Sequence, residues 1–421
     1  MSRRVLQEWR RTIRNLRWNA DTHLRAHERS VSVDQDSIVR IDTCQLAANN
    51  PIEDFYSAAK CLSSNAFLFG VFDGHGGPSC SRHISTSLFP YICASVLQKH
   101  EVKSLPLDHR LEWIFSSADA HLPNLFIETH LENILACHKA FIENKDLCTV
   151  RDALKFAFES CDEDLCRAAL PDSKGHIDRQ EKQFLLKPTK ASVMTAASGS
   201  CATLAHVRGQ NLHVANVGDG AAVLGVVHAN GSVTARQLSR AHCIDNVEEV
   251  VLEPMGSPAP SNLHTPPYLT VAPEVLYHKL TPNDKFLVLA TDGLWEWLDP
   301  DTVVRLVHDH ALGAMTLQPY QPKSGITLKQ VLLELKERKI GAQSHKKPID
   351  ENCATHIIRH ALGGVSGGQT KQYERLIDIL QIPPGRARNY RDDISVIVIH
   401  FNENYLKQEH NSVQQETPET L

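Results

Sequence analysis

An apolar run that stops abruptly at a glycine-rich turn constrains the fold of this chain more than any other feature. Residues 67–77 read FLFGVFDGHGG, in which a short aromatic and branched segment is followed at once by Asp73. Such a segment is typical of a buried strand, and the glycines predict where that strand ends. Asp73 and His75 then lie at the strand end, where a carboxylate can bind a metal ion and an imidazole can transfer a proton. The alternative is an ordinary Asp-Gly turn with no chemical role.

Two later apolar runs also have an aspartate at one end. Residues 286–290 lead into Asp292, and Asp392 precedes the run at 394–401. If these strands lie beside the first one in a single sheet, the carboxylates of Asp73, Asp292 and Asp392 meet at its rim. Mg²⁺ and Mn²⁺ prefer such oxygen ligands, and two ions about 3.5–4 Å apart can clamp a phosphoryl oxygen while activating a water molecule. The sequence therefore predicts a binuclear metal site.

Composition excludes several classes of protein. The 421 residues have ordinary apolar and charged fractions, enough for one large domain or two smaller ones with a substantial core. A net charge of −5 argues against a general nucleic-acid binder. No apolar run approaches the roughly 20 residues that a membrane span needs, so we expect no membrane span. The eleven cysteines contain no C-x-x-C pair, which argues against a disulfide framework and a structural zinc site.

The first 30 residues form a basic, acid-poor leader. Within the first 25 residues, seven arginines stand against only Glu8 and Asp21, with apolar side chains interleaved. This composition suits a mitochondrial transit peptide and predicts a protein of the mitochondrial matrix. The alternatives are a surface helix or a disordered basic arm, for which we expect a cytoplasmic protein.

Hydrophobic periodicity and turn residues predict further elements. Apolar spacing indicates helices over residues 78–98 and 150–170, and a further helix runs from Asp299 to His310. Residues 191–227 carry turn signals every eight to ten residues, which predicts an antiparallel meander. Within it, Asp219 and the glycine after it are most simply a hairpin turn, with metal binding as the alternative.

Five motifs, in order, resemble those of the metal-dependent protein serine/threonine phosphatases of type 2C. They lie at residues 72–77 (FDGHGG), 198–203 (SGSCAT), 217–219 (VGD), 290–296 (ATDGLWE) and 392–396 (DDISV). Within this family the chain most resembles the mitochondrial phosphatases of the pyruvate dehydrogenase complex. The segments behind this narrower resemblance are residues 49–54, 212–216, 264–270, 354–356 with 359–361, and 390–393.

The resemblance implies an α+β fold in which two antiparallel β-sheets pack as a sandwich flanked by helices (αββα). The phosphatase-like domain would span residues 41–402, after the leader at 1–30 and before a disordered tail at 403–421. Relative to the family pattern, several dozen residues are absent near 243–263. We expect this deletion to remove one strand and the flap that faces the substrate.

The resemblance also implies a set of metal ligands at matching positions. Asp73 would bridge two Mg²⁺ or Mn²⁺ ions, and the carbonyl of Gly74 would bind one of them. Asp292 and Asp392 would complete the ligands of the other ion. Asp219 would bind a weaker third ion.

Other matching positions would act around these ligands. Glu53 and Asp54 would reach the ions through water, and His75 would protonate the leaving seryl oxygen. The family often holds the substrate phosphate with an arginine upstream of the acidic pair. Here Asn49 and Asn50 are nearby and Arg40 is farther away in the sequence, which leaves the role open, with Asn49 as the candidate.

Two positions depart from the family pattern beside the expected ligands. The family usually continues Gly-Asp with Ser-Arg, whereas Gly220 and Ala221 follow Asp219 here, so a hydroxyl and a cation are lost. Asp393 stands where the family often has asparagine. We expect Asp393 to support the ligands without binding metal itself.

The function implied by the resemblance is hydrolysis of phosphoserine or phosphothreonine by a metal-activated water. The substrate would be a phosphoprotein, pyruvate dehydrogenase, and a lipoyl domain and a regulatory subunit would be further partners. One alternative is a catalytically impaired phosphatase-like binding or regulatory protein, because the flap and a strand are missing. Another is a phosphodiesterase or other phosphohydrolase that uses the same acids.

Overall fold

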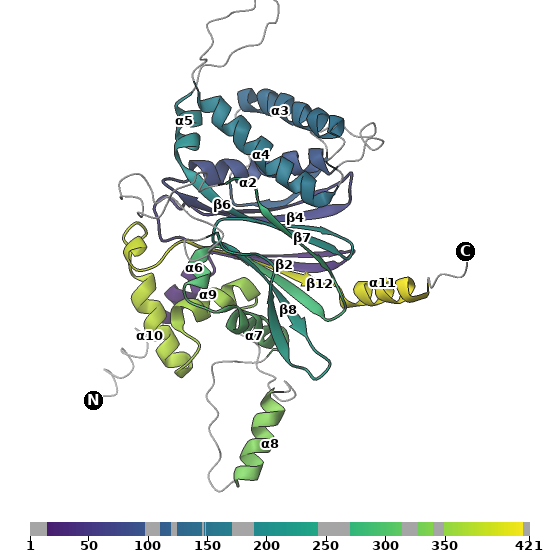
Figure 1. Ribbon diagram of the computed structural model, residues 1–421. Coiled ribbons are helices and arrows are strands. Elements are labelled where there is room, and N and C mark those ends of the chain that lie inside the picture. The colour runs from purple at the N-terminus through teal and green to yellow at the C-terminus, as the bar shows by residue number, and fades with distance from the viewer. Residues whose placement is uncertain are drawn as a thin grey trace, which may run out of the picture. The chain divides into compact units, whose positions relative to one another are not determined.

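The computed structural model describes residues 15–96, 110–118, 124–144, 147, 149–170, 189–242, 270–313, 327–339 and 349–415. The chain divides into two compact units. The first unit comprises Met1–Asn50, Val223–Gln237 and Thr281–Leu421, and the second comprises Pro51–Ala222 and Leu238–Leu280. Each unit is built on one six-stranded sheet with helices around it (Figure 1). The expected α+β class with two antiparallel sheets is confirmed.

The sheet of the second unit has the strand order β10-β7-β6-β4-β3-β5, and neighbouring strands are antiparallel. Its strands are β3 (Phe55–Cys61), β4 (Ala66–His75), β5 (Leu111–Ser116), β6 (Gly199–Arg208), β7 (Asn211–Val217) and β10 (Glu274–Lys279). Its helices are α2 (Ser79–Ser95), α3 (Asn124–Glu143), α4 (Val150–Ala169) and α5 (Lys190–Ala197). Helix α2 packs on the sheet, and α3 and α4 pack on α2 (Figure 1).

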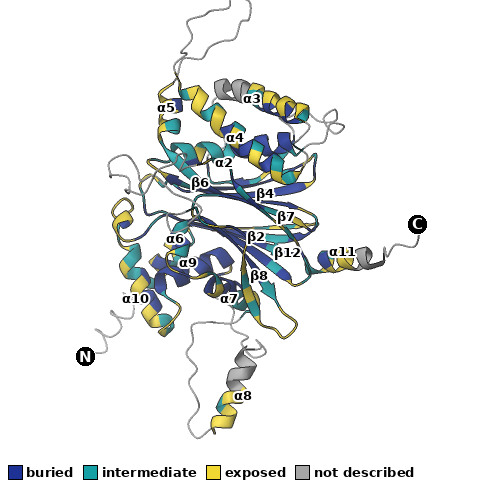
Figure 2. Cartoon of the chain, in the orientation of Figure 1, coloured by how far each residue is buried: buried dark blue, intermediate teal, exposed yellow. Residues whose placement is uncertain are grey.

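Strand β4 lies at the centre of this sheet because both of its faces are apolar. Five of its side chains are at most 2% exposed: Phe67, Leu68, Phe69, Val71 and Phe72. Figure 2 accordingly shows β4 largely in dark blue. The predicted strand is confirmed, and it continues past Phe72 to end at His75.

The sheet of the first unit has the strand order β1-β2-β12-β11-β8-β9. Its strands are β1 (Arg29–Gln35), β2 (Ile38–Leu46), β8 (Ala221–Val227), β9 (Val233–Gln237), β11 (Asp284–Ala290) and β12 (Ile394–Phe401). Its helices are α6 (Asp292–Trp295), α7 (Pro300–Ala311), α8 (Leu328–Lys339), α9 (Cys353–Gly363), α10 (Gly368–Leu380) and α11 (Glu403–Gln415). A further helix covers residues 15–24.

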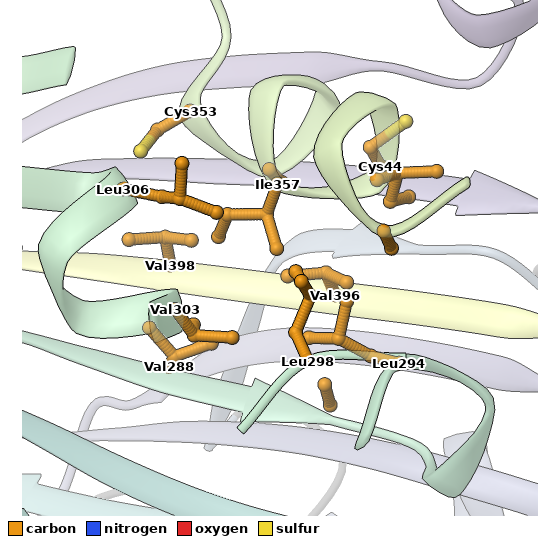
Figure 3. Close-up of a cluster of buried hydrophobic side chains, with 14 of the residues drawn as sticks. Cys44, Val288, Leu294, Leu298, Val303, Leu306, Cys353, Ile357, Val396 and Val398 are labelled. Carbon is orange, nitrogen blue, oxygen red and sulfur yellow. The ribbon is translucent and has the colours of Figure 1, made fainter. Parts of the chain in front are cut away.

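Buried aliphatic side chains join this sheet to α7 and α9. Val288 of β11 and Val396 of β12 belong to one cluster with Val303 of α7 and Ile357 of α9 (Figure 3). Every residue of α9 is buried, so this helix forms the middle of the core of the first unit.

The predicted helices are confirmed where the structure describes them. Helices α2 and α4 lie within the stretches expected from periodicity. Helix α7 begins after Asp299, whose carboxylate accepts the backbone N–H of Thr302 at 2.9 Å, with Pro300 in the first turn. This cap supplies an acceptor for an N–H group that has no partner within the helix.

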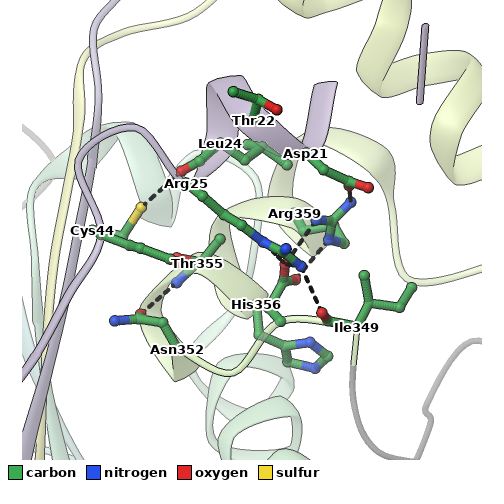
Figure 4. A network of polar contacts seen from close by, with 12 residues as sticks. Asp21, Thr22, Leu24, Arg25, Cys44, Ile349, Asn352, Thr355, His356 and Arg359 are labelled. Atoms are coloured by element: carbon green, nitrogen blue, oxygen red, sulfur yellow. Dashed lines mark hydrogen bonds and ion pairs between the residues drawn. The ribbon is translucent and has the colours of Figure 1, made fainter. Parts of the chain in front are cut away.

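A buried ion pair holds the N-terminal helix in the first unit. Arg359 of α9 contacts both carboxylate oxygens of Asp350, at 2.6 and 2.7 Å, and both side chains are fully buried. Arg359 also pairs with Asp21 at 2.8 Å, and Arg25 reaches the Asp350 carboxylate at 3.1 Å (Figure 4). These contacts fix both ends of the 21–25 segment to α9 and the residues just before it.

The described part of the expected leader is therefore folded. Leu24 is fully buried, and β1 begins within the first 30 residues. The sheet thus starts before residue 41, where we expected the phosphatase-like domain to begin. The tail expected to be disordered from 403 onward begins with α11 instead, because Leu406 is fully buried and Asn402 caps the helix by accepting the N–H of Tyr405.

The chain passes from one sheet to the other after β7, which corrects the expected meander. Strand β6 pairs with β7, but β8 pairs with β9 and neighbours β11. Asp219 and Gly220 therefore lie in a connection between sheets and not in a hairpin turn. The start of the predicted meander is also helical, since α5 extends to Ala197.

The three strands that end in aspartates were expected in one sheet, and this expectation is wrong. Strands β11 and β12 are antiparallel neighbours in the first unit, whereas β4 pairs with β3 and β6 in the second. The apparent deletion near 243–263 lies outside the described residues. Across the described helices, none is both long and apolar enough to cross a membrane.

Asp350→Asn should destabilise the first unit strongly. The substitution removes the bidentate carboxylate from a buried guanidinium, that of Arg359, and losing one partner of a buried ion pair costs about 3–5 kcal/mol. Chemical denaturation measures this loss. Glu163→Gln is the control, because Glu163 forms an exposed pair with Arg167 and its loss should cost less than about 1 kcal/mol. Equal losses for the two variants would contradict the importance of the buried pair.

His206 should make the second unit sensitive to acid. It is 2% exposed, and neither ring nitrogen has a hydrogen-bond partner among the described residues. Burial, together with nearby His213 and Arg208, lowers the pKa of His206 to about 3. The unfolded chain binds a proton near the ordinary pKa of about 6.5. The free energy of unfolding should therefore fall as the pH drops below 6.5, by about 3 kcal/mol at pH 4.5.

Replacing this histidine tests its contribution to the pH dependence. His206→Leu should flatten the fall in unfolding free energy between pH 6.5 and pH 4.5, measured by urea denaturation at each pH. His228→Gln, at an exposed position, should leave the slope unchanged. The same slope in the wild type and in both variants would show that His206 does not contribute.

Candidate active site

Asp73 lies at the end of β4, where two ladders fix its surroundings. In the β3–β4 ladder Phe55 pairs with Phe72, so Glu53 and Asp54 reach the same end of the sheet as Asp73. Asp54 is only 2% exposed. Glu53 and Asp54 therefore lie near Asp73, which is the position that we expected for them.

Gly74 is a glycine for a steric reason. A Cβ at this position would collide with the carbonyl of Glu53 and with the hydroxyl of Ser81. Ser81 donates a hydrogen bond to that same carbonyl at 2.5 Å. The backbone of the acidic pair is thus held tightly against the end of β4.

His75 is the last residue of β4 and is exposed. It pairs with Gly199 across the β4–β6 ladder, and its imidazole lies where a Cβ of Gly199 would be. The missing side chain leaves room for the ring to rest on the backbone of β6. This ring is positioned from one side and open to solvent, which suits a group that exchanges a proton with a bound substrate.

Asp219 lies in the connection after β7 and approaches Asp73. Each offers a carboxylate oxygen, and these two atoms lie within 4.8 Å of each other. The thiol of Cys201 donates to Oδ1 of Asp219 at 3.4 Å. The second unit therefore brings together Asp73 and Asp219, which are 146 positions apart in the numbering.

Asp292 and Asp392 are brought together in the first unit. Asp292 follows β11 and starts α6, and Asp392 precedes β12, its antiparallel neighbour. The side chain of Thr291 accepts the backbone N–H of Ser395 at 3.0 Å, which ties the two strand ends. A Cβ at Gly293 would collide with the backbone carbonyl of Asp393, so the two strand ends are closely packed. Both predicted ligands therefore lie at the same end of two neighbouring strands.

Among the described residues, the Asp392 carboxylate contacts Asp393 and Arg388. It accepts the backbone N–H of Asp393 at 2.7 Å and forms an ion pair with Arg388, whose side chain is 51% exposed. Asp393 is 1% exposed, and its side chain contacts the residues that follow β2. Its carboxylate accepts the backbone N–H groups of Ala48 and Asn49, and the side-chain amide of Asn49 at 3.1 Å. Asp393 thus holds the segment that carries Asn49.

Each unit offers oxygen atoms of carboxylates to a cation. Two carboxylates as close as those of Asp73 and Asp219 repel each other, and a cation between them would offset this repulsion. Hard divalent ions such as Mg²⁺ prefer this donor set, whereas zinc sites usually include nitrogen or sulfur. The residues of the second unit therefore fit Mg²⁺ or Mn²⁺.

Sequence reasoning missed three supporting residues. Cys201 was part of a motif but had no role, and its contact with Asp219 could not be read from its position. The same holds for Asn216, which binds the backbone carbonyls of Gly218 and Arg240. No sequence signal pointed to Ser81, because a serine at the start of a helix is ordinary.

Comparison with known proteins identifies the family. Residues 129–251 and 256–318 match the family described as Protein phosphatase 2C. The mitochondrial pyruvate dehydrogenase (acetyl-transferring) phosphatase 1 of Homo sapiens is 35% identical over 458 aligned residues, covering 90% of this chain and 82% of that protein. The corresponding human phosphatase 2, also mitochondrial, is 31% identical and covers 87% of this chain and 78% of that protein.

A solved structure is similar as well. The serine-threonine phosphatase 2C from Toxoplasma gondii aligns with 89% of this chain and 99% of its own, at 15% identity and a TM-score of 0.45. The sequence relatives favour an enzyme over a phosphatase-like binding protein, and their mitochondrial location agrees with the one expected from the basic N-terminus. This chain belongs to the protein phosphatase 2C family, and it is a metal-dependent protein serine/threonine phosphatase of the mitochondrial matrix.

Proposed function

We propose that this phosphatase acts on phosphoserine of the pyruvate dehydrogenase component of its multienzyme complex. The support is the similarity to two human phosphatases that are named for that substrate, at 35% and 31% identity over most of both chains. From the same resemblance we propose a lipoyl domain of the complex and a regulatory subunit as further partners. A phosphoprotein substrate also agrees with the exposed position of His75.

The observation that carries the proposed site is the approach of the Asp73 and Asp219 carboxylates to within 4.8 Å. Asp73 would bridge two Mg²⁺ or Mn²⁺ ions, and the Gly74 carbonyl would bind one of them. Asp292 and Asp392 would complete the ligands of the other ion, and Asp219 would bind a weaker third ion. Bound ions of this kind lower the pKa of a water molecule and neutralise charge on phosphoryl oxygens.

Residues behind the ligands set the positions of the carboxylates. Glu53 and Asp54 would reach the ions through water. The Glu53 carbonyl is packed against Gly74 and accepts a hydrogen bond from Ser81. Arg388 pairs with Asp392, and because its side chain is half exposed it could turn into solvent if a cation took its place. Asp393 binds backbone N–H groups and so supports the ligand next to it without binding metal.

Asn49 is the proposed contact for the substrate phosphate. One N–H of its side-chain amide donates to Asp393 at 3.1 Å, which fixes the orientation of the amide. An amide nitrogen carries two hydrogens, so the second one can donate to a phosphate oxygen. A neutral donor at this position binds the phosphate more weakly than an arginine would.

His75 is the proposed general acid. When water attacks phosphorus, the seryl oxygen leaves with negative charge and needs a proton, because an alkoxide is a poor leaving group. The imidazole of His75 rests on Gly199 beside Asp73 and is exposed to solvent. It can therefore give a proton to the seryl oxygen and recover one from water.

Asp73→Asn should abolish the metal-dependent release of phosphate from phosphorylated pyruvate dehydrogenase. The amide replaces an anionic ligand, and we expect the rate to fall by at least about a hundredfold. Glu159→Gln, at an exposed carboxylate of α4, should keep the wild-type rate. A folded Asp73→Asn protein with full activity would refute the site. Equal kcat/KM on an unrelated phosphoprotein would refute the substrate and leave the site intact.

His75→Asn should lower kcat on a phosphoserine peptide by about 10²–10⁴-fold. The same variant should hydrolyse p-nitrophenyl phosphate at close to the wild-type rate, because nitrophenolate leaves without being protonated. Steady-state kinetics on the two substrates makes the comparison within one protein preparation. Equal losses on both would show that His75 acts otherwise than as the acid.

A further inference from the structure

Cys201 neighbours both of the aspartates that the second unit brings together. It is the direct partner of Asp73 in the β4–β6 ladder, at the point where β4 ends. Its sulfur also contacts Asp219, with the thiol donating to Oδ1 at 3.4 Å. One side chain of β6 therefore links the strand that carries Asp73 to the carboxylate of Asp219.

The backbone next to Asp219 is packed directly on this sulfur. Gly218 has a φ of +94°, and a Cβ there would collide with Sγ and Cβ of Cys201. Asn216 fixes the same turn by donating to the carbonyls of Gly218 at 3.0 Å and Arg240 at 2.9 Å. Thr203 in turn donates to Oδ1 of Asn216 at 2.6 Å. The backbone of the turn is thus held by Asn216, and Cys201 contacts the Asp219 side chain.

The geometry makes the thiol the donor of this contact. Sγ of Cys201 lies 3.4 Å from Oδ1 of Asp219, and a carboxylate oxygen is an acceptor. A thiol donates a weak hydrogen bond, so the contact can orient the carboxylate without competing with it for a cation.

We propose that Cys201 is a positioning residue that orients the Asp219 carboxylate toward a hard divalent cation. Asp219 is exposed, so its side chain would otherwise sample several rotamers in water. The thiol selects one of them by holding Oδ1. The inference rests on the proposed role of Asp219 as a ligand of the weaker third ion.

The test compares variants that keep or remove the donor. Cys201→Val removes it while filling the space, Cys201→Ala removes it without adding bulk, and Cys201→Ser keeps a donor. Direct binding of Mn²⁺ to the full chain is measured from the free-ion signal in electron paramagnetic resonance. We expect the weakest class of Mn²⁺ sites to lose about tenfold in affinity in the Val and Ala variants. The Ser variant should stay within about threefold of the wild type.

Two controls separate this role from others. Cys166→Val changes an exposed cysteine of α4 and should leave Mn²⁺ binding unchanged. In the Val variant, phosphatase activity should need about tenfold more Mn²⁺ while kcat at saturating Mn²⁺ stays close to the wild type. Unchanged Mn²⁺ binding in both Val and Ala variants would overturn the proposal, as would an equal loss in the Ser variant.

A separate variant tests whether Asp219 is a metal ligand at all. Asp219→Asn should weaken the same class of Mn²⁺ sites as Cys201→Val does. If Asp219→Asn leaves all Mn²⁺ binding intact, Asp219 is not a ligand and the inference about Cys201 falls with it. The phosphatase activity and its dependence on Asp73 would stand in that case.

Discussion

Repulsion between neighbouring carboxylates is the constraint that shapes the site of the second unit. Asp73 and Asp219 offer oxygens within 4.8 Å of each other, and two negative charges this close repel each other. The unit imposes this arrangement through its sheet. Strand β4 is paired on both sides, and Asn216 fixes the turn that carries Asp219. The backbone hydrogen bonds of the ladders thus hold the two carboxylates close together, and a metal ion bound by both would relieve the repulsion.

The first unit contains carboxylates in two kinds of surroundings. Asp350 is paired with Arg359 in the core, where the hydrogen bonds at 2.6 and 2.7 Å compensate the loss of water around both ions. Asp292 and Asp392 instead lie at adjacent strand ends, tied by Thr291. A carboxylate that stabilises the fold is buried with a fixed cation, whereas those proposed as ligands are partly open to solvent.

The sequence predicted elements well where a local pattern decides them. The strand ending at Asp73, the helix capped by Asp299 and the order of the phosphatase motifs were all readable from short stretches. The sequence did not predict which sheet each strand joins, because an apolar strand followed by aspartate looks the same whichever strand it pairs with. The segment at Asp219 resembled a hairpin turn for the same reason. The contact between Cys201 and Asp219 depends on the turn around Gly218, and no periodicity reports it.

The order of segments along the chain has a consequence for folding. The first unit is interrupted by the second, and its contact between Arg25 and Asp350 joins residues 325 positions apart. Every residue of the second unit precedes Thr281, so that unit is fully synthesised, or fully imported, while Asp350 and α9 are still to come. Contacts between residues far apart in sequence form slowly. The second unit is therefore expected to fold first, while the N-terminal helix waits without its partner. A chain that stopped before α9 would contain a complete second unit and an open first one, with Leu24 and the other residues of its core left in contact with water.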